Sequence, residues 1–370
     1  MSVTVAGLMK VMEELAPPDL AEEWDNIGLQ VGDPRQKVER ILVSLDVDER
    51  VVDEAVCQKA DIILSHHPLI FRPIKNLVLT HPLSRIIAKL IKYNIAVFSA
   101  HTNLDIVPGG INDYLAEKLG LTDTEVLDEK KEDQLYKLVV FVPENYLDQV
   151  RDAICAAGAG YIGKYSQCTF SALGEGTFLP LEGTNPFLGE KGKLEKASEY
   201  RLETIIPSRK IKTVLNAMIK SHPYEEVAYD IYPTTLAGVK YGLGRVGYLP
   251  QPLSLEELIL KVKFVLGTDR AKVVGDSKEE ISKVAVCGGG GMSFLNAAIN
   301  KGVQCFITGD SKYHEGQSAL AQGINVIDAG HYETEAIFVS RLVFLLKQNF
   351  SSDSVEVVAS KINTNPWRFY

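Results

Sequence analysis

The segment INVIDAGHYETE, residues 324–335, contains a short apolar run, an Ala-Gly turn and the start of a further segment with helical character. This order predicts a strand, a tight turn and the first turn of a long helix. If the residues after Gly330 are helical, His331 and Glu335 are four positions apart and lie on one helical face. That spacing suits a metal-chelating or acid/base pair, which needs further side chains from elsewhere in the chain.

Two other segments place reactive side chains directly after apolar strands. SHHP, residues 65–68, ends a predicted strand at 62–65, and SAHTNLD, residues 99–105, ends a predicted strand at 95–99. A strand at 40–46 and helices at 49–60 and 82–93 complete a βαβαβ pattern. This alternation predicts a mostly parallel sheet covered by helices, with ligands bound beyond the carboxyl ends of its strands. The polar side chains at those ends are Asp46, His66, His67, His101 and Asp105.

The carboxyl-terminal part of the chain repeats this architecture. We predict helices at 255–266, 292–301 and 317–322, and strands at 284–287 and 303–308, before the segment 324–335. A glycine run, Gly288 to Gly291, follows the first of these strands. The second βαβαβα segment is therefore expected to face the first.

A different pattern separates the two halves. A charged stretch at 122–133 predicts a boundary, and the strands and helices that follow are arranged as βαβ and again βαβ. That order is typical of a ferredoxin-like α+β unit. We therefore predict an α/β protein in which two βαβ-type half-domains, residues 1–126 and 238–370, form one metal-binding core. Residues 127–237 form a ferredoxin-like insertion between them.

Composition excludes several classes of protein. The net charge of −9 argues against a general nucleic-acid or anionic-membrane surface. The five cysteines have no C-x-x-C spacing, which is typical of reduced core residues in an intracellular protein. Residues 1–18 predict an amphipathic helix without the features of a signal peptide, and no membrane span is visible. A cytoplasmic protein is expected.

The donors at the strand ends favour a metal site. Three imidazoles and two carboxylates are more ligands than one catalytic zinc with an open position needs, so two divalent ions bridged by a carboxylate fit better. Nitrogen and oxygen donors suit zinc, manganese, iron or cobalt, and we expect zinc first. Two such ions would acidify a water and hold a substrate oxygen, so hydrolysis is the expected reaction class. The candidate ligands are His66, His67, Asp105, His331 and Glu335.

Each candidate also has a purely structural interpretation. His66 and His67 could form a solvated turn, and Asp105 could cap the helix expected near Ile111. His331 could be an ordinary residue at a helix start, with Glu335 as a surface carboxylate. The joint pattern of several strand ends favours the metal site over these separate explanations.

Further side chains are candidates for catalysis or binding. His101 could act as a general acid, support a metal ligand or orient Asp105, and His314 could act as acid or base or simply begin a surface helix. The glycine run at 288–291 could bind a phosphate or only permit a tight turn. We name His101 and His314 as the catalytic candidates.

The segment EWDNIGLQVG, residues 23–32, has two interpretations that the sequence leaves open. It could be a buried turn with Trp24 in the core. Alternatively, it could form a wall of the active-site pocket that presents Asp25 or Asn26 to a substrate.

These motifs resemble those of the NGG-interacting-factor-three-like family, whose bacterial members are named GTP cyclohydrolase 1 type 2 homologues. The matching segments are WDNIGL at 24–29, SHHP at 65–68, SAHTNLD at 99–105, TGD at 308–310 and GHYETE at 330–335. In that family the two-histidine motif, the aspartate and the His-x-x-x-Glu pair bind a dinuclear metal centre. The resemblance implies that His66, His67, Asp105, His331 and Glu335 are the ligands here.

The resemblance also implies an assembly. Family members form ring-shaped homohexamers with the metal sites facing the interior. Longer bacterial members carry an insertion similar to the CutA and PII signalling trimers, which matches residues 127–237. We therefore expect self-association into a hexameric ring, with trimeric contacts through the insertion.

The leading functional expectation is a metal-dependent hydrolase that acts on a nucleotide or related small molecule, with GTP ring opening as the named reaction. The alternative is a metal-binding regulatory or chaperone-like ring whose insertion senses a ligand. A nucleic-acid-binding scaffold conflicts with the net charge.

Overall fold

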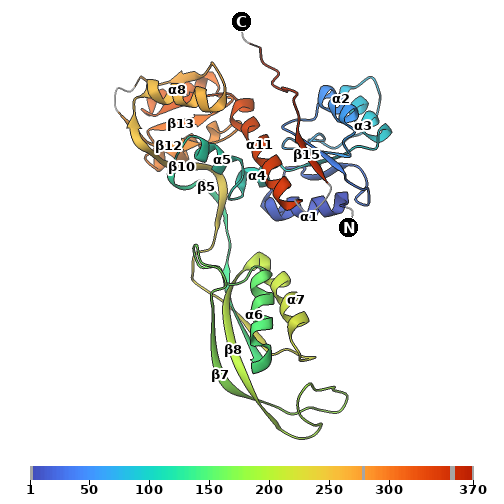
Figure 1. Cartoon of the computed structure of the whole chain (residues 1–370). Coiled ribbons are helices and arrows are strands. Elements are labelled where there is room, and N and C mark those ends of the chain that lie inside the picture. Colours follow the sequence, from blue (N-terminus) through green and yellow to red (C-terminus); the bar gives the residue numbers. More distant parts are fainter. Residues whose placement is uncertain (1–2, 277–279, 351–354, 369–370) are drawn as a thin grey trace. The chain divides into compact units, whose positions relative to one another are not determined.

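The computed structural model describes residues 3–276, 280–350 and 355–368 (Figure 1). The chain divides into two compact units, one formed by Met1–Lys131 with Tyr241–Tyr370 and the other by Glu132–Lys240. We call these the outer unit, because it contains both chain ends, and the middle unit. The sequence placed the insertion at 127–237, whereas the compact middle unit covers 132–240.

The first sheet of the outer unit has the strand order β1-β4-β3-β2-β15. Its central strands are parallel, and β1 is an antiparallel edge. β3 and β4 are buried along their whole length, as expected for a parallel sheet that helices cover on both faces. The strands are β1 (Gly28–Val31), β2 (Arg40–Ser44), β3 (Ile62–Ser65), β4 (Ala96–Ser99) and β15 (Glu356–Ala359).

Helices cover both faces of this sheet. On one face, α2 (Glu49–Gln58) and α3 (Pro82–Lys92) pack against alternate strand residues such as Leu42 and Ile63. On the other, α1 (Val5–Leu15), α4 (Thr102–Ile106) and α5 (Ile111–Lys118) pack against Ile41 and Leu64. The alternation of the two faces follows from the period of two along a strand.

The second sheet has the order β11-β14-β13-β12-β10-β5. β12, β13 and β14 are parallel, with β10 and β11 as antiparallel neighbours. α8 (Leu255–Leu266) and α5 cover one face, and α9 (Leu295–Asn300) and α10 (Tyr313–Ala321) cover the other. The strands are β5 (Thr122–Glu132), β10 (Lys240–Leu253), β11 (Lys272–Val274), β12 (Ile281–Val286), β13 (Cys305–Thr308) and β14 (Asn325–Asp328).

The long helix α11 (His331–Asn349) belongs to both cores and lies between the two sheets in Figure 1. Phe338 and Leu342 are buried in the core of the first sheet, while Ile337 packs against both cores. The first turn of α11 follows the end of β14, so a helix shared by the two halves begins where a strand of the second sheet ends.

The middle unit has the order β6 (Leu135–Pro143), α6 (Leu147–Ala156), β7 (Thr169–Phe178), β8 (Glu195–Pro207), α7 (Ile211–Ser221) and β9 (Tyr229–Pro233). Its sheet order is β7-β8-β6-β9 and all neighbouring strands are antiparallel. This is the ferredoxin-like βαββαβ arrangement that the sequence predicted. Leu138, Val140 and Leu202 point to the helices and share a core with Val150 and Val214.

The α/β class with several sheets is confirmed, but several segments differ from the prediction, among them β10 and β11, which were not predicted. The charged stretch at 122–133 is largely strand β5, where Leu127 alone is buried. Such a strand tolerates charge because it lies at the edge of its sheet. β1 and β15 were not predicted, since short strands carry little periodic signal.

Two other expectations concern cysteines and membranes. All five cysteines are free thiols, as expected, but Cys57 is exposed, so not every one is a core residue. Among the described residues, no helix is both long and apolar enough to cross a membrane.

Candidate metal centre

Six side chains from the ends of three strands meet in the outer unit. His66 and His67 follow β3, His101 and Asp105 follow β4, and α11 carries the remaining two after β14. Within each of three groups, one nitrogen or oxygen per residue lies within 4.8 Å of the others. The groups are His66, His67 and His101; His67, His331 and Glu335; and His66, Asp105 and Glu335. The structure therefore brings together all five ligands expected from the sequence and adds His101.

The backbone explains why the two adjacent histidines face the same place. The N–H groups of His66 and His67 both donate to the carbonyl of Leu45, at 3.1 and 3.0 Å. This pairing bends the chain after β3 over the end of β2, so the imidazoles do not diverge as they would in an extended strand. The hydroxyls of Ser65 and Ser99, 2.8 Å apart, join the ends of β3 and β4.

Glu335 lies at the centre of the cluster and is only 4% exposed. Its Oε2 is 3.1 Å from His67 Nε2 and 3.2 Å from His331 Nε2. Its Oε1 is 3.9 Å from His66 Nε2, which is in turn 3.7 Å from Asp105 Oδ1. Each carboxylate oxygen therefore faces a different set of donors.

The other ring nitrogen of each histidine is fixed by an oxygen acceptor. His66 Nδ1 donates to the carbonyl of Ala100 at 2.9 Å, and the other three imidazoles donate to carboxylates. These pairs are His67 with Asp46 at 2.7 Å, His101 with Asp25 at 2.9 Å and His331 with Asp310 at 2.7 Å. An imidazole whose Nδ1–H is held in this way presents the lone pair of Nε2 as a ligand, and such outer partners are typical of metal-binding histidines.

Buried atoms without partners concentrate in the cluster. Among the described residues, four buried side-chain atoms form no hydrogen bond: Gln36 Oε1, His66 Nε2, Asp105 Oδ1 and Glu335 Oε2. Three of them belong to this cluster. Because buried polar atoms are nearly always paired, this concentration indicates a ligand that binds there. Donors about 2.0–2.2 Å from one ion lie roughly 3–4 Å apart, so the separations above fit a divalent cation.

The histidines differ in their affinity for protons. Burial lowers the pKa of His66 to about 3, so this imidazole is neutral. Burial has the same tendency at His67, but its hydrogen bond to Asp46 and its close contact with the Glu335 carboxylate raise its pKa to about 10. The close contact with Glu335 also raises the pKa of His331 to about 9. Since only neutral imidazole binds a metal, an ion competes with protons at the last two residues.

The two carboxyl groups have opposite pKa shifts. Burial and the negative charge of Glu335 raise the pKa of Asp105 well above its usual value. Burial also opposes ionisation of Glu335, but the close contacts with the imidazoles of His331 and His67 hold its pKa well below the usual range. A cation near both carboxyl groups would favour the ionised form of each.

The segment 23–32 is not the buried turn that the sequence allowed, and it borders the cluster without presenting Asp25 or Asn26 to a ligand. Trp24 is 59% exposed, so it is not a core residue, and its ring contacts His101 edge-on at 6.1 Å. Asp25 is not presented to a ligand, because its carboxylate accepts from His101, the Thr102 N–H and the Thr102 hydroxyl. Asn26 donates to the carbonyl of Ile70. The segment therefore positions His101 and places an exposed indole beside it.

The glycine run also has a different role from phosphate binding. The N–H groups of Gly288, Gly289 and Gly291 donate to Asn112, Thr334 and Thr308, so three of the four donors are already used. Gly289 has a φ of +64°, and a Cβ there would lie 2.4 Å from Glu335 Oε1. The run therefore allows the backbone to approach the buried carboxylate.

The second catalytic candidate, His314, is exposed in the first turn of α10 and hydrogen-bonds Gln317 at 3.0 Å. Within the described chain, no hydrogen bond or ion pair joins it to the cluster, and its catalytic role stays a prediction. The two remaining histidines lie elsewhere: His81 precedes α3, and His222 hydrogen-bonds the carbonyl of Phe141 in the middle unit.

Sequence reasoning assigned no role to the outer partners of the cluster. Asp46 was noted as a strand-end residue, but nothing in the local pattern pairs it with His67. The carboxyl-terminal segment was missed entirely: the Thr364 hydroxyl donates to Asp46, and Asn365 donates to Glu333 at 2.9 Å. These side chains come from a segment without helical or strand periodicity, so no sequence signal was available.

The chain is similar to named bacterial proteins over nearly its whole length. It is 45% identical over 370 residues to a Bacillus subtilis protein named GTP cyclohydrolase 1 type 2 homolog, covering 100% of this chain and 99% of that protein. A Mycobacterium tuberculosis protein of the same name is 36% identical over 371 residues, covering 99% and 97%.

Solved structures extend this similarity to the fold. The crystal structure of a Bacillus cereus protein related to NIF3 superimposes with a TM-score of 0.90 at 42% identity, covering 100% of both chains. A Staphylococcus aureus protein superimposes with a TM-score of 0.73 at 29% identity, covering 100% of this chain and 99% of that one. The family model described as Duf34/NIF3 (NGG1p interacting factor 3) matches residues 3–366. The chain therefore belongs to the DUF34/NIF3 family.

Proposed function

We propose that the chain is a metal-dependent hydrolase that holds two divalent ions and acts on a nucleotide or a related small molecule. The observation that carries this proposal is the position of Glu335, whose two oxygens face two separate sets of donors. The name shared by its relatives, GTP cyclohydrolase 1 type 2 homolog, supports a nucleotide as the substrate class.

Two ions explain the donor set better than one. Asp105 and His66 lie on the Oε1 side of Glu335, whereas His67 and His331 lie on the Oε2 side. A carboxylate with one oxygen toward each set is suited to bridge two cations. The nitrogen and oxygen donors favour zinc, with manganese, iron or cobalt as alternatives.

When bound, two such ions supply an acidified water and a clamp for a substrate oxygen. The residues of the chain then orient the reactants. His101 is held at Nδ1 by Asp25, so Nε2 is the ring atom at which it can donate or accept a proton. Three hydrogen bonds hold the pKa of Asp25 at about 2 despite its burial, so this carboxylate stays an acceptor and fixes the ring.

An exposed aromatic pair beside the cluster suits a heterocyclic substrate. The rings of Trp24 and Phe71 lie edge to face with centroids 5.8 Å apart, and both residues are exposed. Trp24 also contacts the ring of His101. Stacking of a base on such a ring contributes roughly 1–3 kcal/mol, so Trp24 could orient a nucleobase next to the donors.

The proposal includes the assembly expected from the family resemblance. We infer a homohexameric ring in which the ferredoxin-like middle unit, which we regard as CutA/PII-like, makes trimeric contacts. Sedimentation velocity of the full chain tests this part separately. A monomer or dimer at micromolar concentration would contradict the ring without affecting the metal site.

The activity is tested with metal-loaded protein and a panel of nucleotides, with formate and inorganic phosphate as measured products. We expect release of one product from GTP or a related nucleotide, and its loss in His331→Ala. His81→Ala is the matched control, because the His81 side chain makes no capping hydrogen bond and lies outside the cluster. Absence of turnover on every nucleotide, in protein shown by elemental analysis to hold two ions, would refute the hydrolase proposal.

A regulatory role is the second candidate, and a cavity in the middle unit favours it. In that case the metals would be structural or stored and the middle unit would bind a ligand. Ligand binding without any turnover by the metal-loaded protein would distinguish this function from the first.

A further inference from the structure

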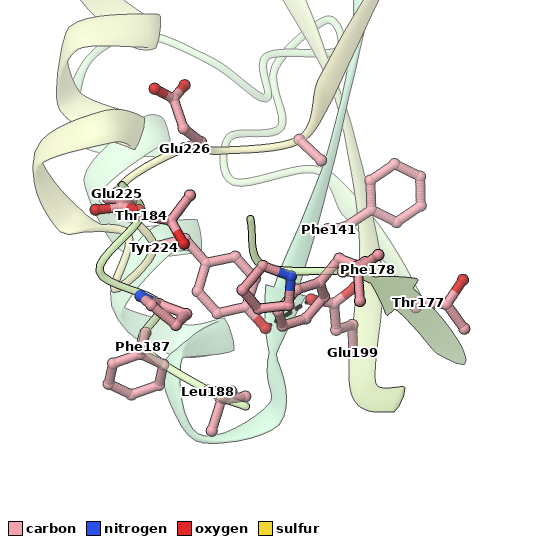
Figure 2. A pocket seen from close by; sticks show the side chains of 15 residues that line it. Phe141, Thr177, Phe178, Thr184, Phe187, Leu188, Glu199, Tyr224, Glu225 and Glu226 are labelled. Atoms are coloured by element: carbon pink, nitrogen blue, oxygen red, sulfur yellow. Dashed lines mark hydrogen bonds between the residues drawn. The ribbon is translucent and has the colours of Figure 1, made fainter. Parts of the chain in front are cut away.

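The middle unit contains a cavity of about 440 Å³, shown in Figure 2. This volume is in the range of small-molecule sites, roughly 300–1,000 Å³. β6, β7 and β8 supply residues of its wall, together with the segments 179–188 and 224–228. Successive side chains of a strand point to opposite faces of the sheet. Phe141 is one position from the core residue Val140, and Glu199 is three positions from the core residue Leu202, so both point away from the core. The cavity therefore lies on the sheet face opposite α6 and α7.

Aromatic rings form much of the cavity wall. Phe178 and Phe187 each lie with their ring centroids 6.0 Å from that of Tyr224, and Phe141 completes the set. The rings of these four residues come from different segments and surround one space (Figure 2). Because the face of an aromatic ring carries negative charge density, such walls attract cations as well as apolar groups.

A buried carboxylate also lines this space. Glu199, on β8, is 8% exposed, and the hydroxyl of Tyr224 donates to its Oε1 at 2.8 Å. Its Oε2 receives no hydrogen bond from any described residue. Burial and the contact with Glu199 raise the pKa of Tyr224, so its hydroxyl keeps its proton and donates to Glu199. One oxygen of a buried carboxylate therefore remains available to a ligand.

The backbone beside Glu199 leaves room for this carboxylate. Gly176 lines the cavity, and a Cβ at this position would lie 2.2 Å from Glu199 Oε2. Any larger residue would displace the carboxylate. Glycine at this position of β7 thus allows Glu199 to occupy the cavity wall.

The charge of the lining is entirely negative. Glu225 and Glu226 line the cavity together with Glu199, and none of its lining residues is lysine, arginine or histidine. Arg201, two positions along β8, is not a lining residue; its guanidinium is bound to Glu203 at 2.7 Å and lies 6.0 Å from the centre of the Phe141 ring. An anionic ligand would therefore meet three carboxylates in the lining and no cationic lining residue.

A metal ion is not the expected ligand, because the cavity offers a single deeply buried carboxylate and mostly apolar walls. A neutral apolar ligand would leave the charge of Glu199 unpaired. We propose that this cavity binds a small organic cation, an alkylated amine whose apolar groups contact the aromatic rings and whose charge faces Glu199. This site is independent of the metal centre and of the hydrolase proposal.

The charge requirement can be tested with choline and its neutral carbon isostere, 3,3-dimethyl-1-butanol, as probes for the full-length metal-loaded protein. The two molecules have nearly the same shape, so their difference in affinity reports the charge. A charge-assisted contact with a buried carboxylate contributes enough for roughly a tenfold preference. We expect calorimetry or ligand-observed NMR to show choline binding at least about tenfold more tightly than the alcohol.

Variants locate the binding site. Glu199→Gln keeps the size of the side chain and an acceptor for Tyr224 but removes the charge, so it should weaken choline binding about tenfold and abolish the preference over the alcohol. Glu175→Gln is the matched control, because Glu175 lies on neighbouring β7, pairs with Lys196 and does not line the cavity. Phe187→Leu, which removes an aromatic wall, should weaken choline more than the alcohol. Circular dichroism and thermal melting establish that each variant is folded.

Two results would overturn the proposal. One is equal affinity of the wild-type protein for choline and the alcohol. The other is choline binding that Glu199→Gln and Glu175→Gln leave equally unchanged. If a cationic side chain of a second copy fills the cavity instead, neither probe binds to the assembled protein and Glu199→Gln weakens self-association; that outcome also refutes a free ligand.

Discussion

The metal cluster of the outer unit and the cavity of the middle unit each enclose a buried glutamate. Glu335 is 4% exposed and is surrounded by the imidazoles of His66, His67 and His331. Glu199 is 8% exposed and meets aromatic rings, with the Tyr224 hydroxyl as its hydrogen-bond donor. The same functional group therefore has two different environments in one chain.

The difference in surroundings predicts that the two buried carboxylates attract different cations. Imidazole nitrogens offer lone pairs at short range, which a divalent ion needs as ligands. Aromatic rings offer only diffuse negative charge and apolar area, which suit a large, weakly hydrated organic cation.

The largest effect that separates the regions is expected at Glu335. Glu335→Gln should remove the charge that both donor sets share, so bound metal is expected to fall below one ion per chain. Activity should fall by more than about 100-fold, which exceeds the usual effect of replacing a residue that only hydrogen-bonds a metal ligand. Elemental analysis and product release measure both. Glu333→Gln is the control on the same helix, since Glu333 contacts Asn365 rather than the cluster. Unchanged metal content in Glu335→Gln would contradict a bridging role.

The outer partners should have the next largest effect. Asp46→Asn weakens the acceptor for His67 Nδ1–H, and a change of this kind typically lowers metal affinity by roughly 10–100-fold. Competition with a chelating dye measures the affinity. Asp53→Asn, at a more exposed carboxylate that pairs with Lys89, should leave it unchanged. Equal metal affinities for Asp46→Asn and Asp53→Asn would show that the hydrogen-bond acceptor of His67 contributes no more to metal binding than an exposed carboxylate.

The aromatic neighbour of the metal cluster should have a moderate effect on substrate binding. Trp24→Ala is expected to raise KM for a nucleotide substrate about tenfold, because stacking contributes roughly 1–3 kcal/mol, with little change in metal content. Steady-state kinetics measure this change. Trp367→Phe alters the other tryptophan and is the control. A fall in kcat with no change in KM would instead assign Trp24 to the positioning of His101.

The anchoring of α11 should depend on pH. Asp328 is buried, but its contacts with Lys272 at 2.6 Å and with the N–H and hydroxyl of Ser311 hold its pKa below the usual value of 3.8. It also accepts from the Gly330 N–H at 3.1 Å, at the start of α11. A depressed pKa stabilises the fold above about pH 4, and this contribution is lost as the pH falls through the folded value. Asp328→Asn should therefore cost about 1 kcal/mol at pH 7 and less below pH 4, as measured by urea unfolding. A pH-independent difference would assign the effect to packing.

The smallest effect is expected when a variant of the middle unit is tested for the functions proposed for the outer unit. Glu199→Gln should leave metal content and the rate of nucleotide turnover unchanged within error, because Glu199 belongs to the middle unit and the cluster to the outer unit. Elemental analysis and kinetics on this variant measure both quantities. A clear loss of either would show that the two glutamates act together.

Much of the architecture could be predicted because strands and helices leave local patterns. The run at 62–65 and the helix at 255–266 have the predicted bounds, since their periodicity and capping residues are local. The edge strands β5 and β15 could not be predicted in this way, because one is charged and the other is four residues long. Their pairing with distant strands decides their conformation.

The candidate site was likewise predicted in part: its ligand candidates could be identified from the sequence, but the contacts that position them could not. His66, His67, Asp105, His331 and Glu335 were identified from motifs and from their places at strand ends. The contact of His101 with Asp25 joins residues 76 positions apart, and that of Thr364 with Asp46 joins residues 318 apart. Because the partners are so far apart in the sequence, no local sequence pattern predicts their contact.

The sequence by itself determined the order of the elements and the donor residues that follow them, because hydrophobic period and residue chemistry are properties of short segments. The tertiary structure alone decided that Glu335 stands between two donor sets, that Trp24 is exposed, and that Glu199 lines an aromatic cavity. The physical reason is that a local pattern records which face of a segment is buried, whereas the partner across that face is set by how distant segments pack together.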